Sequence, residues 1–520
     1  VYDEAGNERK VEFVDDSTSL TQSLPSLDDF LTKNPSDFRM RFDKKAPEIE
    51  SIAWRSSNEG LNVDDFGKSR LVRNGDTLTL EFVTSERISK FADLEGSQKP
   101  SVSFYYSETE LEVSEENITL QSSDENGTKW QAELQIDDNL TSLQDQEGYL
   151  GFKITVLDKA GNQKVIKFED DGTSGDEFVS GLTQKVLPGE EEYSTRNPSD
   201  YRARFDTKLP EVKSITLLSS NQGTNPDYNS ADSNSLLLRD SDTVSLEFVT
   251  SERISTSSDL LGIHKPEVHF ISGTNELSIA AEDIELQTSD QSGTKWVARL
   301  KIDEEVSSLS DKEDYLGFKV TVLDKSGNER TVQFSDDGTN LTQTLPQNAV
   351  VETTNTSGDR ARVDTKRPEI KEISLTSSNT GVNEDFSNSR LVRNGDNLTL
   401  SFETSERISL IEDLEGARKP RVSFYSGDSE MTVSDANISL QSTDENGTKW
   451  EAALKIDSNL PSIKDKEGYL GFEVTVLDKA GNQRVIRFAD DGTSGDTLDQ
   501  GLTQQFLEGE GDHSTSNPTG

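Results

Sequence analysis

Short runs in which apolar and polar residues alternate recur along the whole chain. Thr77–Val83, Ser101–Tyr106, Lys129–Ile136 and Tyr149–Leu157 each place apolar side chains at every second position. This period of two is typical of β-strands that bury one face. The Asn-Gly pair at 126–127 lies between two such runs and predicts a hairpin turn, because both residues tolerate positive φ. The pattern predicts an all-β fold of antiparallel β-sandwiches, with about seven or eight strands in each.

The same pattern returns three times, which indicates a tandem array. Trp130, Trp296 and Trp450 each follow Gly-Thr-Lys and are separated by 166 and 154 residues. The segment VLDKAGNQ at Val156–Gln163 also recurs near residues 322 and 476. We expect the recurring tryptophans to be core side chains, with a ligand-stacking platform as the alternative. A β-propeller is disfavoured, since a unit of this length far exceeds a blade of about 40–50 residues.

The repeats set the predicted domain boundaries. The segment VYDEAGNE at Val1–Glu8 is a near-copy of the recurring motif, so residues 1–42 are expected to be the C-terminal end of a preceding B-type repeat plus a linker. A first repeat of type A follows at residues 43–205, a second of type B at 206–363 and a third of type A at 364–520. The segment Leu182–Gln184 and its copies are expected to dock as an extra strand, to clamp the neighbouring repeat or to form a flexible linker.

Charge and composition narrow the classes of partner. Acidic residues outnumber basic ones by 98 to 53, for a net charge of −45. Binding to nucleic acid is not expected, because phosphate recognition needs basic patches. Membrane insertion of this segment is not expected either, because no apolar run reaches about 20 residues. Such an acidic surface either favours the binding of divalent cations or only keeps the long chain soluble. The absence of cysteine excludes disulfides and favours a bacterial surface or secreted protein.

Three segments of each repeat resemble the bacterial Ig-like repeats of large surface adhesins. They are the junction Phe205–Pro210, with the sequence FDTKLP, the strand segment Gly75–Ile88 and the closing motif Val156–Gln163. The repeats are longer than is usual for this family, and a lysine replaces one linker threonine. The resemblance implies tandem Ig-like β-sandwich domains in an elongated array, an extracellular or bacterial cell-surface location and Ca²⁺ at domain junctions.

Acidic residues that recur in every repeat are the candidate Ca²⁺ ligands. Ca²⁺ prefers six to eight oxygen ligands, mostly carboxylates and carbonyls. The alternative is that these acids stabilise turns through bonds to the backbone. The candidates are Asp43, Glu86, Asp93, Asp158, Asp206, Glu252, Asp259, Asp324, Asp364, Glu406, Asp413 and Asp478. A second set consists of the asparagines of the closing motif, Asn162, Asn328 and Asn482, and of the Asp-Asp-Gly triplets that begin at Asp170, Asp336 and Asp490.

An enzyme is not expected. The three histidines, His264, His269 and His513, do not recur at equivalent positions, and no serine lies in a nucleophile elbow. We expect a structural extender or stalk of a long bacterial adhesin or surface filament, which projects a binding tip. The alternatives are a self-assembling extracellular fibre or sheath subunit and a module that binds glycan or protein. Neighbouring repeats of the same chain are the expected partners, and other copies in a fibre are a further candidate.

Overall fold

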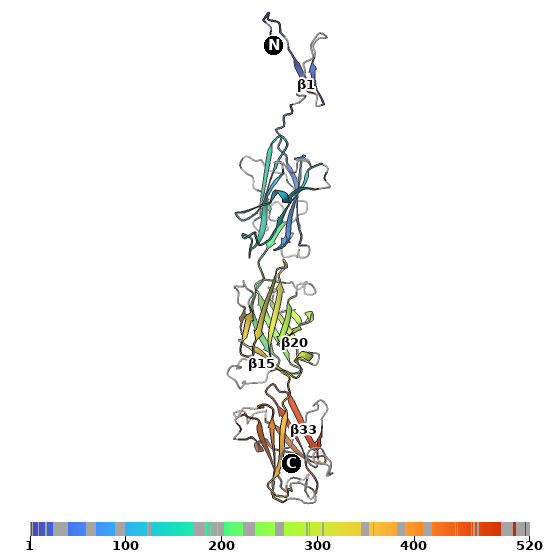
Figure 1. The fold of residues 1–520 in the computed structure, drawn as a ribbon, viewed down its shortest axis with the longest axis vertical. Helices are drawn as coiled ribbons and strands as arrows, with labels where there is room; N and C mark the ends of the chain where they lie inside the picture. The colour runs from blue at the N-terminus through green and yellow to red at the C-terminus, as the bar shows by residue number, and fades with distance from the viewer. Residues whose placement is uncertain are drawn as a thin grey trace. The chain divides into compact units, whose positions relative to one another are not determined.

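A computed structural model shows an all-β fold of tandem β-sandwiches, as predicted (Figure 1). The chain forms two compact units, Val1–Lys208 and Leu209–Gly520. The residues described are 2, 4–8, 10–15, 18–23, 40–58, 69–88, 99–121, 124, 126–170, 182–184, 188, 195, 202–221, 235–254, 265–287, 290, 292–303, 306–344, 353–356, 358–381, 391–408, 419–441, 444, 446–458, 460, 463–464, 467–489, 503–505 and 515.

One sheet of the first repeat has four antiparallel strands in the order β3-β5-β9-β8. They are β3 (Ile49–Ser56), β5 (Thr77–Thr84), β8 (Ile118–Leu120) and β9 (Lys129–Gln135). Along β5 every second side chain is buried, as the alternating sequence predicts. Phe82 pairs with Trp130 across β5 and β9, so their aromatic side chains share the core face of this sheet.

The second sheet of the first repeat is built around β10 (Glu147–Leu157). Its other strands are β4 (Ser69–Val72), β6 (Ser101–Tyr106), β7 (Thr109–Glu112), β11 (Gln163–Asp170), β12 (Leu182–Gln184) and β13 (Arg202–Asp206). β11 pairs with the C-terminal half of β10, whereas β13 pairs with its N-terminal half and, in parallel, with β4. Gly151 allows this packing, because a Cβ there would lie 2.4 Å from the carbonyl oxygen of Phe168.

The second repeat has the same plan. One sheet holds β14 (Val212–Ser219), β16 (Thr243–Thr250), β19 (Ile284–Leu286), β20 (Lys295–Lys301) and β24 (Thr354–Asn355). The other holds β15 (Ser235–Leu238), β17 (Glu267–Ser272), β18 (Asn275–Ser278), β21 (Glu313–Leu323), β22 (Glu329–Asp336), β23 (Leu341–Thr344) and β25 (Arg360–Asp364). β25 repeats the pairing of β13, since it lies antiparallel to β21 and parallel to β15.

The third repeat has one sheet of four described strands and one of five. One holds β26 (Ile370–Ser377), β27 (Asn397–Thr404), β30 (Ile438–Leu440) and β31 (Lys449–Lys455). The other holds β28 (Arg421–Ser426), β29 (Ser429–Thr432), β32 (Gly471–Leu477), β33 (Gln483–Ala489) and β34 (Thr503–Gln505). Short 3-10 turns complete the described elements: η3 (Glu115–Asn117), η5 (Ala281–Asp283), η6 (Ser307–Leu309) and η8 (Asp435–Asn437).

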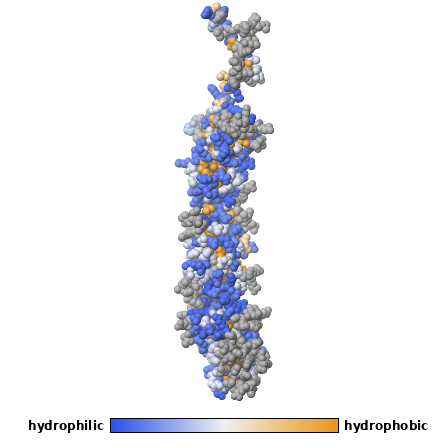
Figure 2. All heavy atoms as spheres, viewed as in Figure 1, coloured by the Kyte–Doolittle hydropathy of each residue, from blue (hydrophilic) through white to orange (hydrophobic). Residues whose placement is uncertain are grey.

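Three separate hydrophobic cores lie between these pairs of sheets. They extend from Ile49 to Phe205, from Val212 to Val363 and from Ile370 to Phe488. The recurring Trp130, Trp296 and Trp450 are fully buried, which confirms the predicted core role and argues against a stacking platform. The outer surface is mainly hydrophilic in the view of Figure 2, with hydrophobic residues only in small groups. The predicted boundaries of the repeats stay a prediction.

The Leu-Thr-Gln segments dock as extra strands on their own sheets, one of the three roles that the sequence left open. β12 pairs with β11, β23 with β22 and β34 with β33. Residues near the start of the chain form a separate hairpin in which β1 (Glu12–Asp15) pairs with β2 (Leu20–Ser23). Among the described residues, no helix is long and apolar enough to cross a membrane.

Candidate metal centre

Three acids from distant segments meet at one end of the first repeat. Asp43 belongs to the linker before β3, Glu86 to the loop after β5, and Asp158 to the turn between β10 and β11. One carboxylate oxygen of each lies within 4.8 Å of one oxygen of both others. The third repeat brings together Asp364, Glu406 and Asp478 in the same way. We call these two groups the first triad and the third triad.

The turn of the closing motif fixes the third acid of each triad. In the third repeat, Oδ1 of Asp478 accepts hydrogen bonds from the backbone nitrogens of Gly481, at 2.7 Å, and Asn482, at 2.8 Å. Gly481 has φ of 93°, a left-handed conformation that favours glycine. Asp158 accepts the equivalent bond from the backbone nitrogen of Asn162 at 2.8 Å. The Asp-x-x-Gly-Asn sequence is therefore a turn whose aspartate is held in a single orientation.

The asparagine of this turn connects it to the linker. Nδ2 of Asn482 donates to Oδ2 of Asp478 and to the backbone oxygen of Asp364, both at 2.7 Å. Nδ2 of Asn162 likewise donates to Asp158 at 2.7 Å and to the backbone oxygen of Asp43 at 3.1 Å. Since the amide nitrogen faces the carboxylate in both repeats, these asparagines position the triad acids.

The Ser-Glu pair after the second strand places the second acid. Thr404 Oγ1 donates to the backbone oxygen of Glu406 at 2.6 Å, which fixes the turn that leads out of β27. Ser405 Oγ accepts a bond from the backbone nitrogen of Glu369 at 2.9 Å and so fastens the linker to this turn. In the first repeat, Ser85 accepts the same bond from Glu48. These hydrogen bonds join the linker to the loop that carries the glutamate without the help of a metal ion.

Two acids of the third triad are buried and Glu406 is half-buried, and the three carboxyl groups oppose one another electrostatically. Asp364 is 5% exposed and Asp478 is fully buried. Burial raises the pKa of Asp364 to about 8, and the negative charges of Asp478, Glu406 and Glu313 add to the effect. Burial raises the pKa of Glu406 to about 7, again with contributions from Asp478 and Glu313. Burial also raises the pKa of Asp478, although the hydrogen bonds from Asn482 partly oppose it.

The first triad has the same residues in a more open environment. Burial acts to raise the pKa of Asp158, but the hydrogen bonds from Asn162 and its neighbours outweigh it and the pKa is lowered. Asp43 keeps 24% of its side-chain surface exposed and pairs with Arg41 at 3.3 Å. The two triads therefore share a donor set and differ in how far solvent is excluded.

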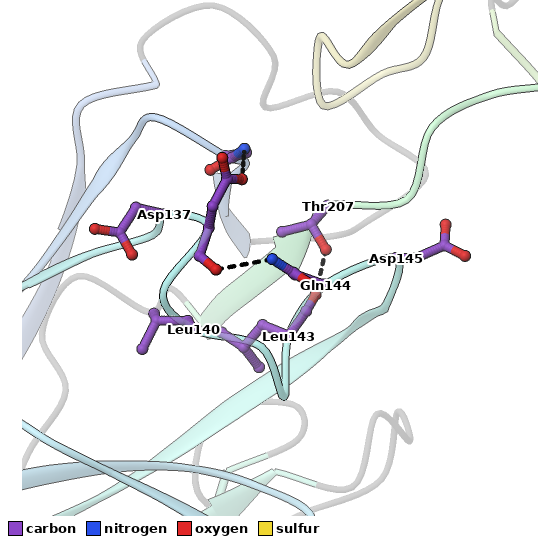
Figure 3. Close-up of a pocket in the computed structure, with 8 residues that line it drawn as sticks. Asp137, Leu140, Leu143, Gln144, Asp145 and Thr207 are labelled. Atoms are coloured by element: carbon purple, nitrogen blue, oxygen red, sulfur yellow. Dashed lines mark hydrogen bonds between the residues drawn. The ribbon is translucent and has the colours of Figure 1, made fainter. Parts of the chain in front are cut away.

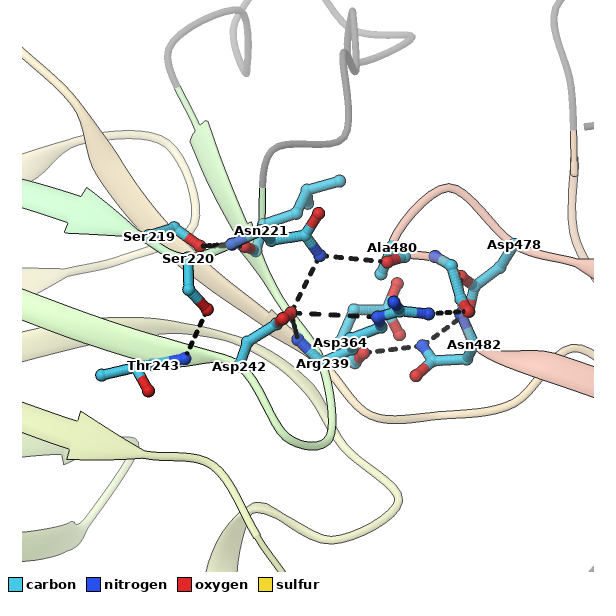
Figure 4. Close-up of polar contacts among 12 residues, drawn as sticks. Ser219, Ser220, Asn221, Arg239, Asp242, Thr243, Asp364, Asp478, Ala480 and Asn482 are labelled. Atoms are coloured by element: carbon cyan, nitrogen blue, oxygen red, sulfur yellow. Dashed lines mark hydrogen bonds and ion pairs between the residues drawn. The ribbon is translucent and has the colours of Figure 1, made fainter. Parts of the chain in front are cut away.

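The second repeat contacts the turn that carries Asp478 (Figure 4). Nδ2 of Asn221 donates to the backbone oxygen of Ala480 at 3.1 Å, and a guanidinium nitrogen of Arg239 donates to the backbone oxygen of Gly481. Asp242 holds both donors in place by accepting bonds from Nδ2 of Asn221 at 2.9 Å and from the backbone nitrogen of Arg239 at 2.8 Å. The turn that carries Asp478 is thereby fastened to the preceding repeat.

The donor set of the triads fits Ca²⁺. Each triad offers up to six carboxylate oxygens, and hard oxygen donors of this kind suit Ca²⁺, with water completing the shell. The raised pKa values of the third triad support the same assignment, because a divalent cation would neutralise charges that otherwise repel in a buried site.

The other sequence candidates fall into three groups. Asp206 belongs to the first unit, whereas Glu252 and Asp324 belong to the second. Asp93, Asp259 and Asp413 lie outside the described residues, as does the triplet acid Asp490.

Two triplet acids have a structural role instead: Asp170 pairs with Arg202, and Asp336 pairs with Arg360 at 2.6 Å. Asn328 donates to Asp324 at 2.8 Å, as its counterparts do in the other repeats.

Glu313 is a contributor that the sequence reasoning missed. Its charge helps to raise the pKa values of Asp364 and Glu406, and it pairs with Arg362. A signal was present, because Glu147 and Glu467 occupy the same place shortly before the Tyr-Leu-Gly-Phe sequence of the other repeats.

A small cavity of about 110 Å³ lies in the first repeat, lined mainly by the loop between β9 and β10 (Figure 3). Asp137, Leu140 and Thr207 are among its lining residues, and Thr207 Oγ1 donates to the backbone oxygen of Leu143. Pockets for small organic ligands are usually about 300–1,000 Å³, so this cavity is too small for one. Ser278 Oγ and His269 Nδ1 lie 3.0 Å apart across the β17–β18 hairpin, at an exposed position of the second repeat.

No curated protein matches the chain. The family model of the bacterial Ig-like domain matches residues 368–490, which confirms that the third repeat is similar to bacterial Ig-like repeats.

Proposed function

We propose that this chain is an extender segment of a long bacterial cell-surface adhesin or filament, in which Ca²⁺ at the triads stiffens the linkers between repeats. The bacterial Ig-like domain indicates a repeat module of a surface protein, and this family is typically not enzymatic. The observation that carries the proposal is the third triad, where two buried carboxyl groups and a half-buried one meet at a linker.

The electrostatics of the third triad support a bound cation. Three ionised carboxylates within 4.8 Å repel one another strongly where solvent is excluded. Without a cation, burial and this repulsion favour protons on some of them, in keeping with the pKa of about 8 for Asp364. A bound Ca²⁺ replaces those protons and converts the repulsion into attraction.

The connectivity of the triad supports a stiffening role. Asp364 ends β25, the last strand of the second repeat, whereas Glu406 and Asp478 belong to the third repeat. An ion held by all three therefore joins the two repeats directly, in addition to the bonds from Asn221 and Arg239. A linker that is fixed at both ends has few conformations left, and this restricts bending between repeats.

An extracellular setting agrees with this mechanism. Bacterial Ig-like domains are common in extracellular surface proteins, and the chain contains no cysteine that would be oxidised there. Extracellular modules bind Ca²⁺ with dissociation constants of about 10⁻⁴–10⁻³ M. We therefore expect the sites to fill outside the cell.

Small-angle scattering of the full chain tests the stiffening role. We expect the maximum dimension to increase, and its distribution to narrow, when Ca²⁺ replaces a chelator. Glu406→Gln should weaken this response, whereas Asp428→Asn, which changes an exposed acid of the same repeat, should leave it intact. A scattering profile that is identical with Ca²⁺ and with chelator would contradict the stiffening role.

A further inference from the structure

The chain enters and leaves the second repeat at opposite ends of the sandwich. β14 begins at Val212, and Asn221, which follows its end, donates to the backbone oxygen of Ala480 in the third repeat. Asp364, the last residue of β25, belongs to the third triad and so lies at this same end. The entry point at Val212 is therefore a full strand of eight residues away from the exit, or about 26 Å.

The first and last strands of this repeat run in the same direction. β15 leads to Arg239, which also contacts the third repeat, and β25 lies parallel to β15. Tension along the chain pulls β14 back from its first residue and β25 forward from its last residue. The hydrogen bonds of each ladder are then loaded together, because the force runs along the strands and across the bonds. A hairpin that is pulled from its open end loses its bonds one at a time instead.

The last strand is bound along both of its edges. β25 pairs in parallel with the four residues of β15 and antiparallel with residues 313–316 of β21. Ala361 and Val363 are fully buried in the core, and Arg360 pairs with the buried Asp336 at 2.6 Å. A slide of β25 by one residue, about 3.3 Å, breaks all of these contacts at once and turns each side chain to the wrong face.

The segment before β25 is bonded to the entering strand itself. Thr353 Oγ1 donates to the backbone oxygen of Val212 at 2.6 Å in a buried position. β24 then pairs in parallel with β14, and the backbone nitrogen of Thr356 donates to the backbone oxygen of Ile215 at 3.0 Å. The hydroxyl oxygens of Thr216 and Thr356 lie 2.6 Å apart, although 140 positions separate the two residues in the sequence. The first and last segments of the repeat are therefore in direct contact.

The first repeat has the same arrangement, although it is of the other type. β13 lies parallel to β4 and antiparallel to β10, as β25 does to β15 and β21. Arg202 pairs with Asp170, and both side chains are buried. Thr195 Oγ1 donates to the backbone oxygen of Ile49, the first residue of β3, at 2.7 Å. In both repeats the last segment thus binds the first residue of the first strand and two strands of the other sheet.

We propose that this last segment is a mechanical clamp, which carries tension from the entering strand to the exit of the repeat. Such a clamp differs from the stiffening of linkers by Ca²⁺, because it sets the force that one repeat withstands and requires no ion. Unfolding under force is governed by the rate of unfolding and not by the equilibrium stability. Contacts of the two terminal segments set this rate, whereas contacts elsewhere in the sandwich break only after the clamp has opened.

Pulling on the second repeat within the full chain tests the clamp. The sequence contains no cysteine, so Leu209→Cys and Lys366→Cys, at two exposed positions, attach handles on either side of this repeat alone. We expect one unfolding step at constant force, in chelator. Thr353→Val should raise the unfolding rate at the same force about tenfold, because it removes the buried bond to Val212.

A second variant and a matched control keep the clamp separate from overall stability. Thr356→Val, at an exposed residue, removes the hydroxyl bonds to Thr216 and Ile215 and should raise the rate about threefold. Thr331→Val removes a similar hydroxyl bond, the one to Thr321 between β21 and β22, and should leave the rate unchanged.

An unchanged rate for Thr353→Val overturns the proposal. If that variant does not fold, an unchanged rate for Thr356→Val overturns it in the same way. Equal increases for Thr356→Val and Thr331→Val also overturn it, because the rate would then report the stability of the whole repeat. Since all rates are measured in chelator, a failure of Ca²⁺ binding does not alter them, and the clamp and the proposed function fail separately.

Discussion

Asp364 and Asp478 lie far apart in the sequence, yet their carboxylates meet within 4.8 Å, and the charge of Asp478 helps to raise the pKa of Asp364 to about 8. One residue ends the last strand of the second repeat, and the other stands in a turn of the third. A repulsive pair at such a place is stabilised by protons or by a cation, and the two cases respond to pH in opposite ways.

Without Ca²⁺, the third repeat should lose stability as pH rises from about 4 to 8. Asp364 has a pKa near 3.9 when unfolded and about 8 when folded, so the folded state binds more protons throughout this range. Each such group lowers the free energy of unfolding by up to about 1.4 kcal/mol per pH unit. Urea unfolding in chelator at pH 5 and pH 8 checks this, and a third repeat that is equally stable at both values would refute it.

Asn482→Ala should destabilise the third repeat by about 1–3 kcal/mol. The substitution removes the bonds to Asp478 and to the backbone of Asp364 and leaves a buried carboxylate short of a donor. Asn437→Ala, at an exposed residue of η8, is the control and should change little. Thermal unfolding of the unsubstituted chain and of the two variants measures the difference in stability. An equal loss of stability from both substitutions would show that Asn482 does not bridge Asp478 to the linker.

Removal of the ion pair between Arg360 and Asp336 should lower the free energy of unfolding more than removal of an exposed ion pair. Their side chains are 7% and 0% exposed, so Arg360→Ala leaves an unpaired buried acid and should cost about 3–5 kcal/mol. The pair of Arg299 and Glu285 is exposed by 45% and 57%, and Arg299→Ala should cost less than about 1 kcal/mol. Chemical unfolding distinguishes them, and similar values for both would show that β25 is not anchored by Arg360.

Gly471→Ala should destabilise the third repeat by about 1–3 kcal/mol, because the new Cβ would lie 2.5 Å from the backbone oxygen of Phe488 and push β32 away from β33. Gly468 is three residues earlier and has no atom within 4 Å of an added Cβ. Gly468→Ala should therefore be tolerated. Hydrogen exchange of β33 reports the strand pairing directly, and the two variants should behave differently there.

The strands were predictable because their alternation is strong. The run Ser101–Tyr106 is β6, and Thr77–Val83 differs from β5 by one residue. β13 was missed as a strand, because its arginines at 202 and 204 make it look like a polar linker. Only the fold shows that Asp170 and Glu147 stand opposite those arginines.

The candidate site was predictable in part. Recurrence identified Asp43, Glu86 and Asp158 as candidates, and the fold brings them together. It could not separate these acids from Asp170, which recurs as regularly and pairs with Arg202 instead. Burial also depends on the neighbouring repeat, so the sequence of one repeat could not show that the third triad is enclosed and the first is open.

Isothermal titration of the full chain with Ca²⁺ at pH 7, in buffers of different ionisation enthalpy, tests the central claim most directly. We expect Ca²⁺ to bind with release of protons, because Asp364 and Glu406 have pKa values of about 8 and about 7 without it. Glu406→Gln should lose one site, whereas Asp428→Asn should keep them all. An absence of Ca²⁺ binding, or a stoichiometry that Glu406→Gln leaves unchanged, would contradict the account.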